Sequence, residues 1–135
     1  MKHLASGRCL CGAARFEIAG EWESFFLCHC ARCRKDTGTA HAANLFSSRA
    51  EITWLSGRET IKTFQLPGTR HVRSFCTECG SALPSLQLDG ALLVVPAGSL
   101  DTEVGIRPTA HISYASRASW DDRLDAVEKI DELPS

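Results

Sequence analysis

The 135-residue chain is long enough to bury a hydrophobic core and short enough for one unit, so we expect a single domain over residues 1–135. Charged residues make up 23% of the chain, and the formal net charge is −1. A protein that binds a phosphate backbone usually carries an excess of positive charge, so we expect no nucleic-acid partner. The most apolar run, residues 91–98, is too short to span a bilayer, so we expect no membrane insertion.

Short runs bounded by Gly, Pro, Asn or Asp predict a mainly antiparallel β fold with little helix. We expect strands over residues 13–19, 25–27, 40–46, 51–55, 59–66 and 70–75, a hairpin over 83–88 and 91–95, and a further strand over 106–114. Residues 31–37 predict one or two helical turns that end at Gly38, and residues 124–133 show a weaker helical periodicity.

The seven cysteines are the main chemical signal in this chain. Residues 1–7 contain no apolar stretch typical of a signal peptide, so we expect a cytoplasmic protein with reduced thiols. In that compartment clustered cysteines indicate metal ligands rather than disulfides, and an odd number could not pair completely. The three clusters are Cys9/Cys11, Cys28/Cys30/Cys33 and Cys76/Cys79. Zinc is the metal that thiolate clusters usually hold, so we expect two zinc ions per chain.

The first and last clusters have the same local pattern. Gly12 directly follows Cys11, and Gly80 directly follows Cys79. A glycine at this position permits a tight turn in which backbone N–H groups face the sulfur atoms. Two such turns facing each other would combine Cys9, Cys11, Cys76 and Cys79 into a closed four-thiolate site. A closed site is structural, because no coordination position remains for a substrate.

The central cluster, Cys28, Cys30 and Cys33, supplies only three ligands. Its fourth ligand is a histidine, a water molecule or a group brought by a substrate, and the last two are typical of a catalytic zinc. The alternative is a second closed site of the three-cysteine, one-histidine type. His41 follows the cluster closely and is the best candidate for a fourth ligand or a proton carrier. His29 lies between two ligands, where an extended chain would direct its side chain away from theirs.

Three cations, Arg32, Arg34 and Lys35, surround the central cluster. Three thiolates on one Zn²⁺ leave a net negative charge. These three side chains, on a solvated turn, would balance that charge. Alternatively, they would bind the carboxylates of an acidic thiol ligand.

The three cysteine motifs, in this order, resemble those of the glutathione-dependent formaldehyde-activating (GFA, centromere protein V-like) family. The matching residues are Gly7-x-Cys9-x-Cys11-Gly12, Cys28-His29-Cys30-x-x-Cys33-Arg34-Lys35, Phe75-Cys76-x-x-Cys79-Gly80-Ser81, Gly98-Ser99-Leu100-Asp101 and Trp120. The resemblance runs from about residue 7 to residue 120, and the tail over 121–135 carries no motif of the family.

The resemblance implies an Mss4-like fold of folded antiparallel sheets with two zinc ions. Cys9, Cys11, Cys76 and Cys79 would hold the structural ion, and the central cluster would hold the ion of the active site. The implied activity is that of a carbon–sulfur lyase, which forms or cleaves S-hydroxymethylglutathione from glutathione and formaldehyde. Members of one family need not share a substrate, so another thiol or aldehyde stays open.

This resemblance leads to a mechanistic hypothesis. A thiol substrate completes the open zinc site as a thiolate and attacks an aldehyde carbonyl, or the reverse cleavage occurs. His41 or a water molecule moves the proton. The alternative is a non-enzymatic, zinc-scaffolded protein-interaction module in which the second site is closed. Exposed strand edges would also permit a homodimer.

Overall fold

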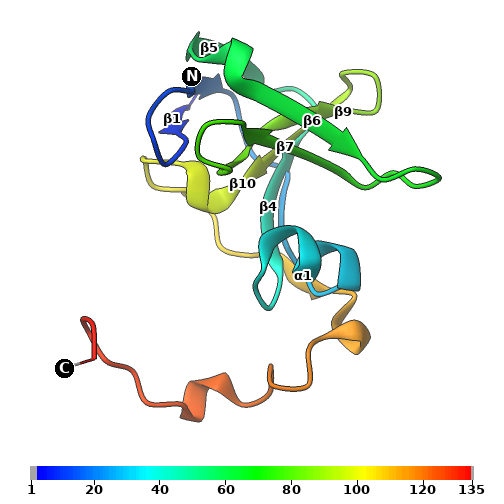
Figure 1. Cartoon of the computed structure of the whole chain (residues 1–135), viewed down its shortest axis with the longest axis vertical. Helices are drawn as coiled ribbons and strands as arrows, with labels where there is room; N and C mark the ends of the chain where they lie inside the picture. The colour runs from blue at the N-terminus through cyan, green and yellow to red at the C-terminus, as the bar shows by residue number, and fades with distance from the viewer. Residues whose placement is uncertain (1–2, 135) are drawn as a thin grey trace.

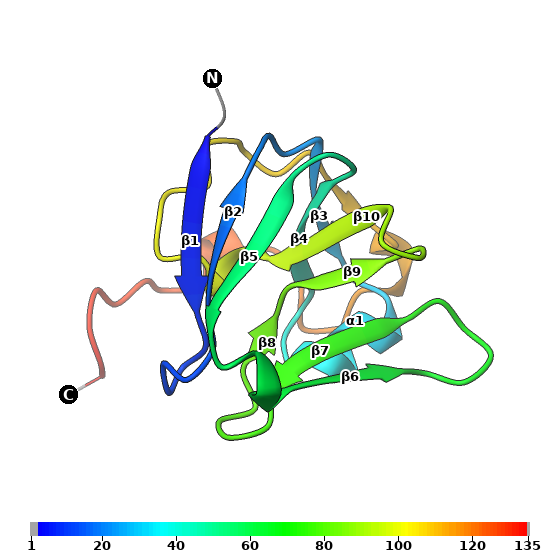
Figure 2. The same ribbon diagram turned by 90° about the horizontal axis from the view of Figure 1, so that it is seen from above.

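The computed structural model describes residues 3–134 and shows a mainly β protein with three sheets and a single short α-helix within that range (Figures 1 and 2). The strands are β1 (Leu4–Arg8), β2 (Arg15–Ala19), β3 (Ser24–Cys28), β4 (Ala42–Ser47), β5 (Glu51–Ser56), β6 (Ile61–Gln65), β7 (Val72–Cys76), β8 (Ala82–Leu83), β9 (Ser85–Gln87), β10 (Leu92–Pro96) and β11 (Ala110–Ile112). The helix is α1 (Ala31–Thr37). The predicted mainly β class with little helix is therefore confirmed.

The first sheet contains β1, β2 and β5, with β2 in the middle. Side chains alternate along β2, so Phe16 and Ile18 both enter the core. Trp54 of β5 packs edge-on against Phe16, with ring centroids 5.4 Å apart. The β1–β2 pairing ends at Arg8 opposite Arg15. The turn between these two residues therefore projects from the end of the hairpin, and it carries the first cysteine pair.

The central sheet has the order β11-β3-β4-β10-β9. Leu45 of β4 and Val95 of β10 lie opposite each other and are fully buried, which places the middle of the core on this sheet. At one edge, β11 pairs with β3 in parallel, with Ile112 opposite Cys28. This pairing brings a late segment of the chain beside the central cysteine cluster.

The third sheet contains β6, β7 and β8. Strand β7 ends at Cys76, so the second cysteine pair lies in the β7–β8 turn. The other end of β7 lies against α1, because Asp36 contacts both His71 and Arg73. Figure 1 shows β6 and β7 above α1, and in Figure 2 they lie in front of this helix.

The C-terminal tail differs from the prediction. A helix over residues 124–133 was expected, but the structure contains only a 3-10 turn at Leu124–Ala126, so that prediction was wrong. The apolar side chains of the tail are exposed; they are Leu124, Val127, Ile130 and Leu133. A short helix depends on burying its apolar face, and here the tail runs away from the folded body (Figure 1).

Two further strand predictions also needed correction. The expected strand over residues 106–114 shrinks to β11, and it joins its neighbour in parallel rather than antiparallel. Strand β1 was not expected at all, because its sequence LASGR has little alternation and contains a glycine. Gly7 is required there, since a Cβ atom would collide with Phe16 and with the backbone of Ser99. No helix among residues 3–134 is long and apolar enough to cross a membrane.

Candidate metal centres

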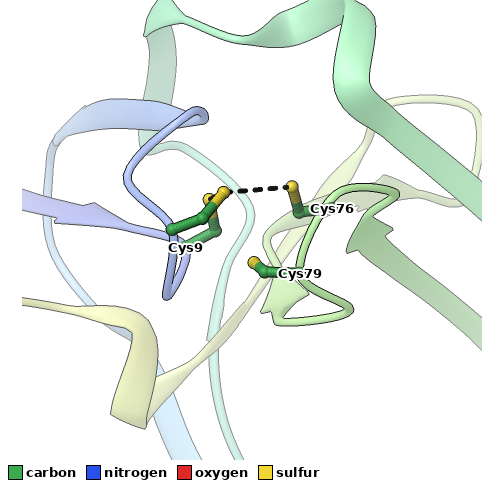
Figure 3. Close-up of side chains that lie close together, drawn as sticks. Cys9, Cys76 and Cys79 are labelled. Carbon is green, nitrogen blue, oxygen red and sulfur yellow. Dashed lines mark hydrogen bonds between the residues drawn. The ribbon is translucent and has the colours of Figure 1, made fainter.

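The first cysteine group joins two turns that are distant in sequence. Cys9 and Cys11 lie in the β1–β2 turn, and Cys76 and Cys79 lie at the β7–β8 turn. Their four sulfur atoms all lie within 4.8 Å of one another. The Sγ atoms of Cys9 and Cys11 are 3.6 Å apart, and those of Cys11 and Cys76 are 4.0 Å apart. Figure 3 shows Cys9 from one turn facing Cys76 and Cys79 from the other.

Backbone geometry holds both turns in place. Gly12 and Gly80 have φ angles of 79° and 77°, in the left-handed region that glycine adopts without strain. The N–H of Gly12 donates to the carbonyl of Cys9, and the N–H of Gly80 donates to the carbonyl of Cys76. The expected similarity of the two turns is therefore present in the structure.

Ser81 connects the two turns and favours the thiolate of Cys79. Its Oγ accepts a hydrogen bond from the backbone N–H of Leu10 at 2.8 Å and lies 3.3 Å from the sulfur of Cys79. The Ser81 hydroxyl, together with the backbone N–H of Cys11, lowers the pKa of Cys79 to about 5. This thiol is therefore ionised at neutral pH, as a metal ligand must be.

The second cysteine group forms where β3 passes into α1. Cys28 ends β3, Cys30 is the N-cap of α1, and Cys33 lies in the first turn of the helix. The three sulfur atoms lie within 4.8 Å of one another. The Sγ of Cys30 accepts a hydrogen bond from the backbone N–H of Cys33 at 3.4 Å. Local capping geometry therefore brings these sulfur atoms together.

The thiols of the second group differ in their acidity. Burial opposes the ionisation of Cys30, but the backbone N–H of Cys33 and the neighbouring thiols outweigh it and lower the pKa of Cys30. Burial, with hydrogen bonds to Cys28 and Cys30, raises the pKa of Cys33 well above its ordinary value. A cation held between the sulfur atoms would favour the thiolate at all three positions.

Within residues 3–134, no other Cys, His, Asp or Glu joins this second group at the same distance. The side chain of His29, which lies between two of the cysteines, takes part in other contacts. Its Nε2 is 2.8 Å from Nδ1 of His111, and its Nδ1 is 3.0 Å from Oδ2 of Asp121. His29 itself is 1% exposed, so its imidazole is buried between these partners.

His41 belongs to the same cluster of rings. Its ring centroid is 5.0 Å from that of His29 and 6.3 Å from that of His111. Burial and the nearby His29 lower the pKa of His41. Tyr114 lies 5.0 Å from His29 by ring centroids and completes the cluster. His41, which the sequence suggested as a fourth ligand or proton carrier, therefore lies beside His29 and outside the sulfur group.

Sequence reasoning did not associate His111, Tyr114 or Asp121 with this site. Nothing in their local pattern distinguishes them from other polar residues of the chain. The parallel pairing of β11 with β3 places His111 beside the end of β3, and the segment that follows β11 brings Tyr114 and Asp121 to His29.

The three cations near the second group have different surroundings. Arg34 donates from Nε to the backbone carbonyl of His29 at 3.3 Å, which ties α1 to the preceding loop. Arg32 and Lys35 are exposed. Arg34 therefore has a structural contact, while the other two are solvated charges.

Comparison with known proteins agrees with this arrangement. Residues 4–116 match the family described as glutathione-dependent formaldehyde-activating enzyme, and this stretch contains all seven cysteines. The chain belongs to that family. The resemblance seen in the cysteine motifs is thus confirmed, and both sulfur groups lie within the matched segment of this GFA-family protein.

One individual relative supports the same assignment, and two further similarities are more limited. A Halomonas elongata protein, named as a candidate glutathione-dependent formaldehyde-activating enzyme, is 31% identical over 127 residues, covering 87% of this chain and 79% of the relative. A Lysobacter enzymogenes protein named as an ATPase is 32% identical over 93 residues, which are 69% of this chain but 7% of that protein. A solved Rhodobacter sphaeroides structure matches with a TM-score of 0.55 and 22% identity, over 78% of this chain and 98% of that one. The last similarity concerns the fold alone.

The donor atoms of both groups fit zinc. Four sulfur atoms in the first group satisfy the coordination number of a structural zinc. Three sulfur atoms in the second group match the protein ligand count of a catalytic zinc. Both groups are therefore suited to bind a metal ion, and soft sulfur donors favour zinc over magnesium or calcium.

Proposed function

We propose that this GFA-family protein is a zinc-dependent carbon–sulfur lyase that acts on the adduct of a thiol and an aldehyde, such as S-hydroxymethylglutathione. One observation carries the proposal: the sulfur atoms of Cys28, Cys30 and Cys33 converge without a fourth protein ligand among the described residues. A three-ligand group leaves room for a substrate sulfur, whereas a closed group does not. The family match supports glutathione as the thiol and formaldehyde as the aldehyde.

In this proposal the two groups have separate roles. Cys9, Cys11, Cys76 and Cys79 hold a structural zinc that joins the β1–β2 and β7–β8 turns. Cys28, Cys30 and Cys33 hold the second zinc. A zinc ion held by these three cysteines would lower the pKa of a substrate thiol that binds beside them.

The reaction balances without a further reactant. The thiol sulfur bonds to the carbonyl carbon of formaldehyde, and the carbonyl oxygen takes up the proton that the thiol has lost. The reverse reaction breaks the same carbon–sulfur bond. We assign the proton transfer to His41, because its lowered pKa keeps the ring neutral near pH 7 and able to accept a proton.

The test uses the cobalt-substituted protein, whose sulfur-to-metal absorption bands report the number of sulfur ligands. We expect glutathione to add one sulfur ligand to one of the two metal ions in the wild type. Cys30→Ser should remove this response, whereas Cys79→Ser, if the variant remains folded, should retain it. A spectrum that does not change with glutathione would contradict the proposal and favour the zinc-scaffolded interaction module.

A second measurement separates metal binding from catalysis. His41→Gln should keep the spectral response to glutathione but lower the rate of S-hydroxymethylglutathione formation by about 10²-fold, the lower end of what a general acid–base group provides. An unchanged rate in this variant would remove His41 from the proposed mechanism and leave the proton to water.

A further inference from the structure

A cavity of about 200 Å³ begins at the second cysteine group. Cys33 lines one end, and the cavity continues between α1, β4, β7 and the β9–β10 pair. Cys33, Asp36 and Thr37 are spaced by three and four residues along α1, so they share one face of the helix and all line this space. A ligand in the cavity would therefore lie beside Cys33, one of the three cysteines of the central group.

Charged side chains gather on the opposite wall. Arg70, His71 and Arg73 line the cavity at the start of β7. Asp36 reaches across from α1, with Oδ2 at 2.7 Å from Nε2 of His71 and Oδ1 in contact with Nη1 of Arg73. The side chains of His71, Arg73 and Asp36 are 19%, 25% and 15% exposed, so this contact is largely shielded from water.

The charges of this wall do not cancel. Two arginines, Arg70 and Arg73, line the cavity together with a single carboxylate, that of Asp36, and only Arg73 pairs with it. Among residues 3–134, Arg70 makes no ion pair, and it is an exposed residue of the cavity lining. Arg73 donates from Nη1 to Oδ1 of Asp36 and from Nη2 to the carbonyl of Gly80. A guanidinium has five N–H donors, so Arg73 has donors left for a ligand. The wall therefore has the capacity to bind one more anion.

The distance between the central cysteine group and the arginines of the cavity wall matches a thiol whose carboxylate lies close to its sulfur. Cys33 and Asp36 are one helical turn apart, roughly 5–6 Å between their Cβ atoms, and Arg73 contacts Asp36. One extended residue spans about 3.3–3.6 Å. A carboxylate one or two residues away from a cysteinyl sulfur would thus reach the arginine pair.

We infer that this cavity, through Arg70 and Arg73, binds a carboxylate of the thiol substrate. The preferred substrates are short thiols with a carboxylate one or two residues from the sulfur, and neutral thiols are disfavoured. Asp36 is a positioning residue, because its two oxygens fix the orientation of His71 and Arg73. This inference rests on the proposed function, since it assumes that a substrate sulfur approaches the central cysteine group.

Calorimetric titration of the full-length, cobalt-loaded protein tests this inference with two probes, glutathione and its diethyl ester. The ester keeps the thiol but masks both carboxylates. We expect the wild type to bind glutathione about tenfold more tightly than the ester, the effect of one charged hydrogen bond. Arg70→Gln should remove most of this difference without changing the affinity for the ester, and Arg70→Lys should retain part of it. Arg107→Gln changes an exposed arginine outside the cavity lining and is the matched control.

The outcomes separate this inference from the proposed function. If both probes add a sulfur ligand to cobalt but bind with equal affinity, the carboxylate site is excluded and the proposed function stands. The same conclusion follows if Arg70→Gln weakens both probes equally or leaves the preference for glutathione intact. If neither probe changes the cobalt spectrum, both proposals fail together.

Discussion

Oδ2 of Asp121 lies 3.0 Å from Nδ1 of His29, which joins the start of the C-terminal tail to the loop between two cysteines of the central group. Both side chains are shielded, at 12% and 1% exposure. Nε2 of the same imidazole contacts His111, so His29 is held from both sides. The loop that carries Cys28 and Cys30 is therefore positioned by residues from the last quarter of the chain.

Removing this carboxylate should loosen the loop. Asp121→Ala would remove the carboxylate that lies beside the buried Nδ1 of His29, so we expect a loss of about 1–3 kcal/mol in the free energy of unfolding. Chemical denaturation measures this loss, and Asp122→Ala is the control because Asp122 is exposed. We also expect faster release of one metal ion to a chromogenic chelator. Equal stability of the two variants would show that the contact contributes nothing.

Metal content should separate the two cysteine groups. We expect the wild type to contain two zinc ions, and Cys30→Ser and Cys79→Ser to contain one each, because each substitution removes a thiolate from a different group. Elemental analysis of the purified proteins counts the ions. A wild type with a single zinc, or a Cys30→Ser variant with two, would contradict the assignment.

The pH dependence of stability should report His41. Burial favours its neutral ring, so its pKa in the folded protein lies below the unfolded value of about 6.5. The unfolded chain then binds more protons as pH falls through this range, and the contribution of His41 is complete above pH 6.5 and lost at lower pH. We expect the melting temperature to fall less steeply between pH 7 and pH 5 in His41→Gln than in the wild type. Identical slopes would argue against a buried, neutral His41.

A substitution at Gly57 should disturb the packing between the end of β5 and the β1–β2 turn. The φ angle of Gly57 is 73°, and a Cβ atom there would collide with the backbone of Ala13 and Ala14. Gly68 has a similar φ angle of 76° but open space around it. Both alanine variants should lose about 1–2 kcal/mol from the left-handed conformation, and Gly57→Ala should lose more because the backbone must move. Thermal unfolding compares the two, and a smaller loss for Gly57→Ala would refute the clash.

The three cysteine clusters, the helix over residues 31–37 and the mainly β class could be predicted because their signals are local. Cysteines separated by one or two residues lie in the same turn, wherever that turn is placed. The helix begins at Cys30, its N-cap, and ends at Gly38, whose φ of 70° places it in the left-handed region. Alternation along β2 needed only five residues to identify the buried face at Phe16 and Ile18.

Tertiary structure decided which distant side chains meet. The contacts of His29 with His111 and Asp121 depend on the parallel pairing of β11 with β3, which no local pattern encodes. The same holds for the cavity, whose two walls come from α1 and β7. Residues 124–133 have a helical pattern but their apolar side chains stay exposed, and only the 3-10 turn at Leu124–Ala126 forms there. A short segment adopts the conformation that packing permits, and packing is a property of the whole chain.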